Sequence, residues 1–451
     1  LHQRITDKAY GEKLAALAES DLCRDPHSDA GANVRQLKRQ FDKKTKLPED
    51  LVKEQARLSI LGQQAWVDAR KNNDFPAFQP LLEQIVKLKR EEAAALGFPE
   101  VPYDALLDDF EPEEKTSNVA RVLAGLRKEL VPLVAELVDS GKRPDNSILK
   151  RTFPIEAQKA FGREAAQRVG FDFSRGRLDV SAHPFCGGSG PHDIRMTTRY
   201  SESFFSESFF GTLHETGHGL YEQGLIAENF GVPLGEAISL GIHESQSRMW
   251  ENLVGRSRPF WEFHFPLAQK AFPSALGDVS LDAFYAAIND VAPTLIRVEA
   301  DECTYNLHIL IRFELEQALV HDELQVADLP GAWNEKYKSF LGIIPPTDAL
   351  GVLQDIHWSG GAIGYFSTYS LGNLYAAQLF DQAEKDLGDL ATAFAYGEYH
   401  ALLDWLRDKI HRHGRRYTAA ELVKNVTGKP LSHEALMTDL KNKFRPLFGL
   451  A

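Results

Sequence analysis

The chain has 451 residues, 43% of them hydrophobic, so it can bury a large core in one domain or in two or three smaller ones. Its net charge of −13 argues against a nucleic-acid-binding protein, because such proteins carry strongly basic surfaces. No apolar run approaches the roughly 20 residues of a membrane-spanning helix, no secretory signal peptide is visible, and three widely spaced cysteines favour a reducing cytoplasm.

The first 170 residues carry the 3–4 spacing of apolar residues that is typical of long amphipathic helices. This spacing predicts helices over 47–72, 75–97 and 117–141. Pro48 suits the start of the first helix, because its missing N–H costs little there. Gly97 suits a left-handed cap at the end of the second. We interpret the apolar faces of these helices as core.

The helical spacing is lost over residues 171–201. The stretches RLDVSAHPF and DIRMTTRY alternate apolar with polar residues, and the glycine-rich CGGSGP lies between them. This pattern predicts two short strands joined by a turn. Helices resume at about 204 and continue to the C-terminus, with no stretch typical of an interdomain linker. We therefore predict one mainly α-helical domain over 1–451, with a small β-sheet beside the functional site.

The first helix after this sheet contains the sequence GTLHETGHGL at 211–220. His214 and His218 are one helical turn apart, so both imidazoles can reach one zinc ion, and Glu215 lies beside them. Zinc lowers the pKa of a bound water, and a neighbouring carboxylate can take its proton. The alternative is an exposed helix with two solvated histidines.

A catalytic zinc site usually needs a third protein ligand. Glu244 follows His214 by thirty residues, in a predicted helical stretch over 234–255 that can pack back against the first helix. The adjacent His243 either orients a ligand or is a buried, hydrogen-bonded side chain. Three other glutamates compete with Glu244 for the ligand role: Glu222, Glu228 and Glu236.

Five further motifs occur in a fixed order around HETGH: HPF (183–185), DIRMT (193–197), HES (243–245), IRVEAD (296–301) and GVLQDIHW (351–358). With these motifs the chain resembles the carboxypeptidase Taq family of metallocarboxypeptidases over nearly its whole length. The resemblance implies a large helical, groove-containing fold related to neurolysin-like peptidases. It also implies a homodimer and a divalent metal, Zn²⁺ or sometimes Co²⁺. The sequence itself leaves Mn²⁺ as a further alternative. His214, His218 and Glu244 match the family's metal ligands, and Glu215 matches its catalytic base.

An enzyme that removes C-terminal residues must bind a free carboxylate, and the planar fork of arginine suits this task. Arg195 and Arg297 are our candidates, and the resemblance indicates the same two motifs. Asp193 and Asp301 are expected to hold these arginines, and the alternative is that each arginine forms only a structural ion pair. His183 is expected either to line the closed end of the site or to pack at a strand end.

Hydrolysis also requires donors that stabilise the oxyanion. The stretch 351–374 supplies His357, Tyr365 and Tyr369 beside several glycines. The resemblance to related peptidases implies that His357 and Tyr365 contact the reacting carbonyl, with Tyr369 as the next candidate. Asp355 is expected to fix a histidine tautomer. The alternative for each tyrosine is core packing with a satisfied hydroxyl.

We therefore predict a cytoplasmic, metal-dependent carboxypeptidase that acts on peptides with a free C-terminus and binds neither nucleic acid nor membrane. One alternative is an oligopeptidase that cuts peptides internally. Another is a non-catalytic peptide-binding protein with a structural metal. Glu215 argues against the second alternative, because a purely structural site has no use for a base.

Overall fold

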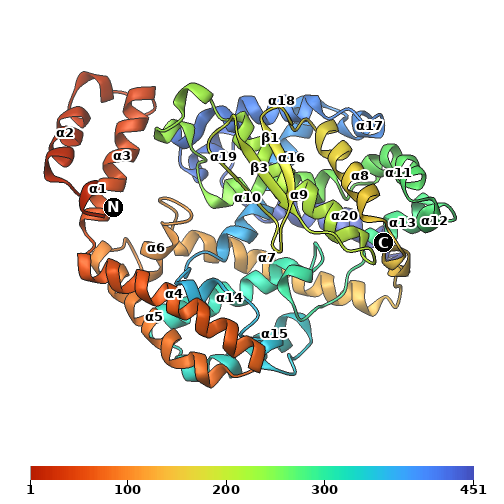
Figure 1. Ribbon diagram of the computed structural model, residues 1–451, viewed down its shortest axis with the longest axis horizontal. Coiled ribbons are helices and arrows are strands. Elements are labelled where there is room, and N and C mark those ends of the chain that lie inside the picture. Colours follow the sequence, from red (N-terminus) through yellow and green to blue (C-terminus); the bar gives the residue numbers. More distant parts are fainter. Residues whose placement is uncertain (1, 451) are drawn as a thin grey trace. The chain divides into compact units, whose positions relative to one another are not determined.

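The computed structural model describes residues 2–450 and consists mainly of helices, with one small sheet (Figure 1). The mainly α-helical fold with a small sheet is therefore confirmed. The chain divides into two compact units, one formed by residues up to 135 with 291–370, the other by 136–290 with residues from 371. Compactness alone does not identify independent domains, so the single-domain assignment stays a prediction.

The first unit is all-helical. Its α4 and α5 are joined at Asn73, whose left-handed backbone (φ 54°) ends α4, and Asp74 then caps α5 through the Ala77 N–H. The predicted helices over 47–72, 75–97 and 117–141 are confirmed as α4, α5 and α7. The helices that lie in or begin in this unit are α1 (His2–Ile5), α2 (Lys8–Ala18), α3 (Asp29–Thr45), α4 (Glu49–Asn72), α5 (Phe75–Leu96), α6 (Pro102–Leu107), α7 (Thr116–Asp139), α14 (Tyr305–Val320), α15 (Leu329–Leu341) and α16 (Ser367–Leu387).

The second unit holds the sheet and the remaining helices. An aromatic cluster fills part of its core, in which Phe161, Phe205, Phe209 and Trp261 are almost completely buried. The helices of this unit are α8 (Ile155–Arg168), α9 (Phe205–Gly224), α10 (Leu240–Arg248), α11 (Arg258–Ala271), α12 (Pro273–Leu276), α13 (Leu281–Ile288), α17 (Leu390–Ala395), α18 (His400–Lys409), α19 (Ala419–Thr427) and α20 (Glu434–Leu447).

The sheet has three strands instead of the predicted two. β1 (Gly176–Val180) covers the start of RLDVSAHPF, whereas β2 (Phe185–Gly188) lies mostly in the glycine-rich CGGSGP that was predicted as a turn. β3 (Ile194–Thr198) lies between them in the order β1-β3-β2. β1 is parallel to β3, whereas β2 is antiparallel to it. Residues 181–184 separate β1 from β2 and end in Pro184, which lacks the N–H that a strand would donate. The prediction of two strands joined by a CGGSGP turn was therefore wrong, because most of β2 is formed by that stretch.

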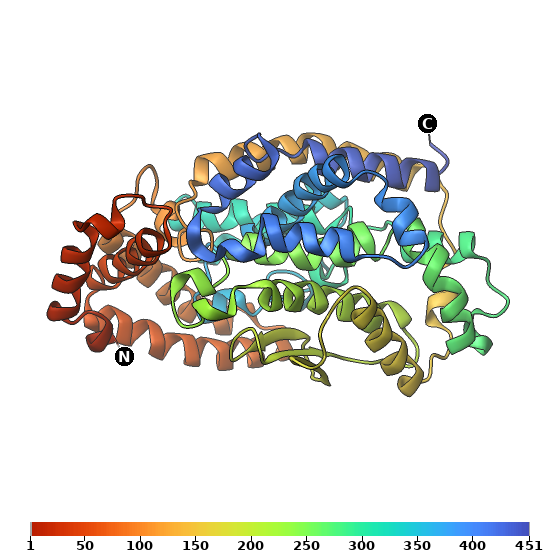
Figure 2. The same ribbon diagram turned by 90° about the horizontal axis from the view of Figure 1, so that it is seen from above.

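The sheet packs on α9, which also contacts α10 (Figures 1 and 2). A Cβ atom at Gly219 of α9 would lie 3.1 Å from the Met196 Sδ of β3 and 2.6 Å from Phe171. The close contact of helix and sheet thus depends on a residue without a side chain.

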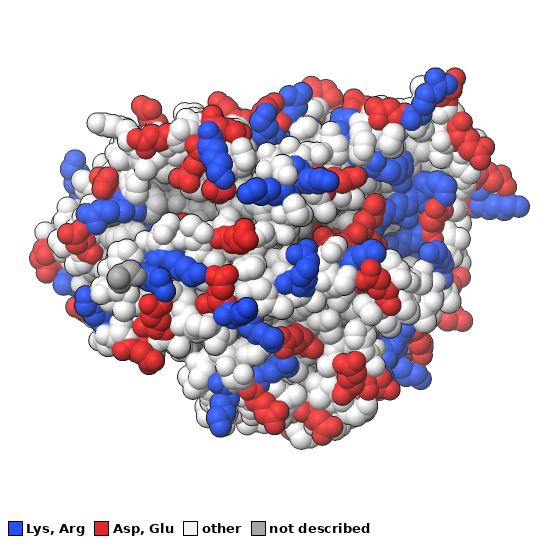
Figure 3. Space-filling model, turned by 180° about the vertical axis from the view of Figure 1, so that it is seen from behind, with Lys and Arg blue, Asp and Glu red and all other residues white. Residues whose placement is uncertain are grey.

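The surface carries both signs of charge. Figure 3 shows acidic and basic side chains interspersed over one face, as expected for a chain with 64 acidic and 51 basic residues. Within residues 2–450, no helix combines the length and the hydropathy needed to cross a bilayer.

Candidate metal centre

Three potential metal ligands meet between α9 and α10. The Nε2 atoms of His214 and His218 lie 3.7 and 3.4 Å from Oε2 of Glu244. One ligand atom from each residue lies within 4.8 Å of the other two. The structure therefore brings together the two imidazoles of HETGH and the carboxylate of HES, which are thirty residues apart in sequence.

Two features of the local sequence allow this approach. Ser239 caps α10 by accepting a hydrogen bond from the Ile242 N–H, which fixes where the helix begins. Gly217 lets α9 and α10 pack tightly, since a Cβ atom there would lie 2.4 Å from the Gln246 carbonyl oxygen and 2.6 Å from the Ser247 Cα. The glycine of HETGH thus has a steric role beside the ligand residues.

The second ring nitrogen of each histidine has its own partner. His214 Nδ1 lies 2.9 Å from Oε2 of Glu251. His218 Nδ1 lies 2.5 Å from Nδ1 of His243, whose Nε2 lies 2.8 Å from Oε1 of Glu222. Such outer contacts fix ring orientation and tautomer, and they leave both Nε2 atoms available for a metal.

The competing glutamates lie outside the three-residue group. Glu222 contacts His243 rather than the facing Nε2 atoms. Glu236 pairs with Arg415 at 3.1 Å, and Glu228 is exposed in a short helical turn. Of the two interpretations of His243, the geometry favours an orienting role.

Glu251 and Arg248 contact the centre but were not predicted from the sequence. Glu251 lies on a π-helical turn (Met249–Val254) that follows α10, and such turns are frequent at functional sites. Arg248 Nε donates to Glu244 Oε1 at 2.8 Å, and its Nη1 donates to Glu251 Oε2 at 3.2 Å. Arg248 and Glu251 follow Glu244 by four and seven residues, so both lie on the same helix face as this proposed ligand. This spacing was the signal in the sequence that could have identified them.

The surroundings of the centre shift the pKa values of Glu215 and Glu244 in opposite directions. Burial raises the pKa of Glu215 to about 7, and the nearby Glu244 and Glu251 add to this effect against His214. Burial also acts on Glu244, but Arg248 and His214 outweigh it and hold its pKa well below the ordinary value. One carboxylate is therefore kept charged, whereas the other titrates near neutrality.

The donor set fits a divalent metal ion. Two imidazole nitrogens and one carboxylate oxygen form a combination found in catalytic zinc sites. Glu244 is buried, and the side chains of His214 and His218 are 20% and 17% exposed. Both outer ring nitrogens are hydrogen-bonded, as those of metal-bound histidines usually are.

Arg195 and His183 lie on or beside the sheet of the same unit. The Arg195 side chain is 58% exposed, and its Nε and Nη2 donate to Asp193 at 3.0 and 2.8 Å. Asp193 thus holds Arg195 in the predicted way. His183 is exposed in the loop between β1 and β2, so it does not pack at a strand end.

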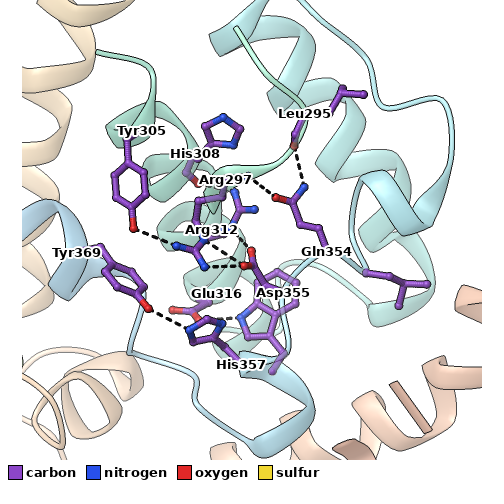
Figure 4. A network of polar contacts seen from close by, with 12 residues as sticks. Leu295, Arg297, Tyr305, His308, Arg312, Glu316, Gln354, Asp355, His357 and Tyr369 are labelled. Carbon is purple, nitrogen blue, oxygen red and sulfur yellow. Dashed lines mark hydrogen bonds and ion pairs between the residues drawn. The ribbon is translucent and has the colours of Figure 1, made fainter. Parts of the chain in front are cut away.

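Arg297 belongs to a buried network in the first unit (Figure 4). Its Nε and Nη2 donate to Oδ1 of Asp355 at 3.0 and 2.8 Å, and its Nη1 donates to the Tyr305 hydroxyl at 2.9 Å. The expected partner, Asp301, instead accepts hydrogen bonds from the N–H groups of Cys303 and Thr304 at the start of α14. The pairing of Asp301 with Arg297 was therefore wrong.

Asp355 also accepts a hydrogen bond from Arg312, whose Nε lies 2.7 Å from Oδ2. Its oxygens thus serve two arginines and do not fix a histidine tautomer as predicted. Arg312 is fully buried, and its position within the apolar stretch ILIRFEL was the available signal for a paired buried charge.

His357, Tyr365 and Tyr369 lie together in this network. His357 Nε2 is 3.2 Å from the Tyr369 hydroxyl, and its ring centroid is 5.1 Å from that of Tyr365. Burial lowers the pKa of His357 to about 4, so the ring is neutral at pH 7 although Asp355 favours its charged form. A neutral imidazole still carries one N–H donor.

Known proteins are similar to this chain over nearly its whole length. A family model described as "Carboxypeptidase Taq (M32) metallopeptidase" matches residues 1–444. "Thermostable carboxypeptidase 1" of Thermus thermophilus is 49% identical over 458 residues, covering 100% of this chain and 90% of that protein. "Carboxypeptidase 1" of Bacillus subtilis is 42% identical, covering 94% of this chain and 85% of that protein.

Solved structures show the same similarity. The crystal structure of the M32 carboxypeptidase from Deinococcus radiodurans has a TM-score of 0.96 and 40% identity, covering 100% of this chain and 90% of that one. The Pyrococcus furiosus carboxypeptidase has a TM-score of 0.94 and 37% identity, covering 98% and 89%. The chain therefore belongs to the carboxypeptidase Taq (M32) metallopeptidase family and is a metallocarboxypeptidase, a peptide hydrolase.

Proposed function

We propose that this enzyme removes single amino acids from peptide C-termini, using a divalent metal held by His214, His218 and Glu244 and a general base, Glu215. The observation that carries the proposal is the convergence of three ligand atoms within 4.8 Å of one another, with Glu215 buried at the next position of the same helix. Zn²⁺ is the proposed ion because two imidazoles and one carboxylate suit it, with Co²⁺ and Mn²⁺ as alternatives.

A divalent cation at this position would supply Lewis acidity and lower the pKa of water. The role of Glu215 is to take a proton from the attacking water and to return it to the departing amine. A carboxyl group whose pKa is about 7 can both accept and donate a proton near neutral pH. Glu244 remains charged throughout, because Arg248 lowers its pKa.

Recognition of the substrate carboxylate is assigned to Arg195 and Arg297. Arg297 uses three of its five N–H groups on Asp355 and Tyr305, which leaves two donors and a rigid orientation. Asp355 is shared with Arg312, so two buried guanidinium groups contact one carboxylate. This surplus of positive charge favours a bound anion. The guanidinium group of Arg195 on β3 is exposed and is held by Asp193.

His357, Tyr365 and Tyr369 are proposed as donors to the oxyanion. His357 and Tyr369 share a hydrogen bond that holds both side chains in place. The pair can therefore direct one donor toward a substrate oxygen without a change of side-chain conformation. His183 is proposed as a further substrate contact because its side chain is exposed beside the sheet that packs on α9.

We further propose a cytoplasmic homodimer that acts on peptides and binds neither nucleic acid nor membrane. The acidic net charge supports the absence of nucleic-acid binding. Sedimentation of the full chain tests the dimer, and a monomer at micromolar concentration would contradict it.

The proposed activity is tested by incubating the enzyme with matched peptides that have a free or an amidated C-terminus, followed by mass spectrometry. We expect a ladder of single-residue losses from the free peptide alone, its loss with a chelator, and its return on addition of Zn²⁺. Internal fragments from both peptides would instead identify an oligopeptidase. No cleavage by fully metal-loaded protein would identify a peptide-binding protein with a structural metal.

A further inference from the structure

The two carboxylate oxygens of Glu244 have different partners. Oε1 accepts a hydrogen bond from Arg248 Nε at 2.8 Å. Oε2 faces the Nε2 atoms of His214 and His218, with Ser247 Oγ 3.0 Å away. Only one of the two oxygens is therefore presented to the candidate metal position.

The stem of Glu244 is packed against α16. A Cβ atom at Gly372 of α16 would lie 2.5 Å from the Glu244 Cγ and 2.7 Å from its Cβ. The backbone of α16 thus lies directly against the stem, while Arg248 and Ser247 contact the carboxylate. The side chain is buried, which limits its alternative rotamers further.

Arg248 is itself fixed from the other side. Its Nη1 donates to Oε2 of Glu251 at 3.2 Å, and the same oxygen lies 2.9 Å from His214 Nδ1. Arg248 therefore connects the carboxylate ligand to the residue that orients one imidazole ligand. A single guanidinium group sets the geometry of two of the three ligands.

We propose that Arg248 is a positioning residue that restricts Glu244 to one ligand oxygen and thereby makes the centre selective for Zn²⁺ over the more oxygen-preferring Mn²⁺. A carboxylate that offers both oxygens raises the coordination number, which suits ions that prefer oxygen ligands. With Oε1 neutralised by Arg248, the centre presents two nitrogens and one oxygen. This inference rests on the metal site of the proposed function.

The test compares metal binding by the full-length wild-type enzyme, Arg248→Met and Arg256→Met. Arg256 is the matched control: its loss removes one positive charge beside Glu251, 3.7 Å away, and its described contacts include Asn252 and Ile288 but not Glu244. Metal-free protein is dialysed against Zn²⁺ or Mn²⁺ alone, and bound metal is measured by mass spectrometry.

For Arg248→Met we expect weaker Zn²⁺ binding by about 10- to 100-fold, the usual effect of removing an outer-shell partner. Mn²⁺ binding should fall much less, so that the affinity ratio moves toward Mn²⁺ by about tenfold or more. Arg256→Met should leave the ratio within about threefold of wild type. In the Co²⁺-loaded enzyme, Arg248→Met should weaken the visible absorption band, because that intensity falls as the coordination number rises.

If Arg248→Met does not fold, Arg248→Lys is measured in its place. Lysine keeps the positive charge but loses the guanidinium contact to Oε1 of Glu244. It should shift the ratio in the same direction by a smaller factor. An unchanged ratio in the folded Arg248 variants, or an equal shift in Arg256→Met, would overturn the inference. Failure of the proposed site is a different result: wild-type enzyme that binds no metal, or that binds it as well after His214→Ala.

Discussion

At the scale of single residues, the centre assigns different tasks to neighbouring carboxylates through their surroundings. Glu244 is ionised beside Arg248, Glu251 supports His214, and Glu215 is buried with a pKa of about 7. The proposed ligand Glu244 is paired with an arginine, whereas burial dominates the surroundings of the proposed base Glu215. Separation of acid–base roles by environment is typical of hydrolases.

Replacing Glu215 by Gln tests this assignment, because the amide keeps the shape but cannot accept the proton. We expect kcat to fall by about 10²–10⁴-fold or more, the usual contribution of a general base. Metal content per chain should stay at the wild-type value. Enzyme assays paired with metal analysis measure both, and a variant that retains wild-type activity would remove Glu215 from the mechanism.

The two proposed carboxylate ligands are tested by Arg195→Lys, Arg297→Lys and the double variant. Lysine keeps the charge but loses the planar fork, so each single variant should lose about 1.5–3 kcal/mol of preference for free over amidated peptides, and the double variant should lose more. The wild-type enzyme is the reference. The measurement is kcat/KM for both peptides. Retention of the preference in both variants, and in the double variant, would place the carboxylate pocket elsewhere.

At the scale of elements, the local patterns were predictable and the tertiary pairings were not. The helical spacing of His214 and His218 follows from periodicity alone. The pairing of Arg297 with Asp355 joins segments 58 residues apart, so the nearer Asp301 misled the sequence analysis. Glu251 was missed because its partner, His214, lies 37 residues away in sequence, on another helix. The third strand was missed because Cys186, Gly187 and Gly188 of β2 belong to a glycine-rich stretch that is typical of a turn.

Helix packing around the centre predicts opposite effects for two glycines of α9. Gly217→Ala would place a Cβ atom 2.4 Å from a backbone oxygen of α10, so α10 must move with Glu244. We expect a loss of about 1–3 kcal/mol of unfolding free energy, typical of overpacking, and weaker Zn²⁺ binding. Gly211→Ala would meet only Thr198 Oγ1, at 3.4 Å, and should keep both within error or gain slightly in stability.

Chemical denaturation and Zn²⁺ titration of both variants provide the comparison. A Gly217→Ala protein that binds Zn²⁺ like wild type would show that the close approach of α9 and α10 does not position the ligand. An equal loss in Gly211→Ala would indicate a general effect of removing glycine from this helix.

At the scale of the whole molecule, stability must tolerate several histidines that are buried as neutral rings. His264 is 1% exposed and stacks on Phe260, with ring centroids 4.1 Å apart. Burial, with a contribution from Arg168, lowers its pKa from 6.5 to about 3. Within residues 2–450 its Nε2 has no hydrogen-bond partner, so this nitrogen adds no hydrogen bond to the stability of the folded protein.

The sign of the pH dependence follows from these values. The unfolded chain takes up a proton at His264 below pH 6.5, whereas the folded protein does so only near pH 3. The free energy of unfolding therefore decreases as pH falls from 6.5 toward 3, and this residue contributes about 2 kcal/mol of the loss between pH 8 and pH 5.

In His264→Phe a phenyl ring would take the stacked position between Phe260 and Tyr399 without a titrating group. The wild type should lose about 2 kcal/mol more than the variant between pH 8 and pH 5, because the other buried histidines contribute equally to both proteins. Denaturant titrations at a series of pH values measure this difference. Parallel stability curves would show that His264 has the same pKa in the folded and unfolded chain, so that the acid sensitivity of the enzyme comes from other groups.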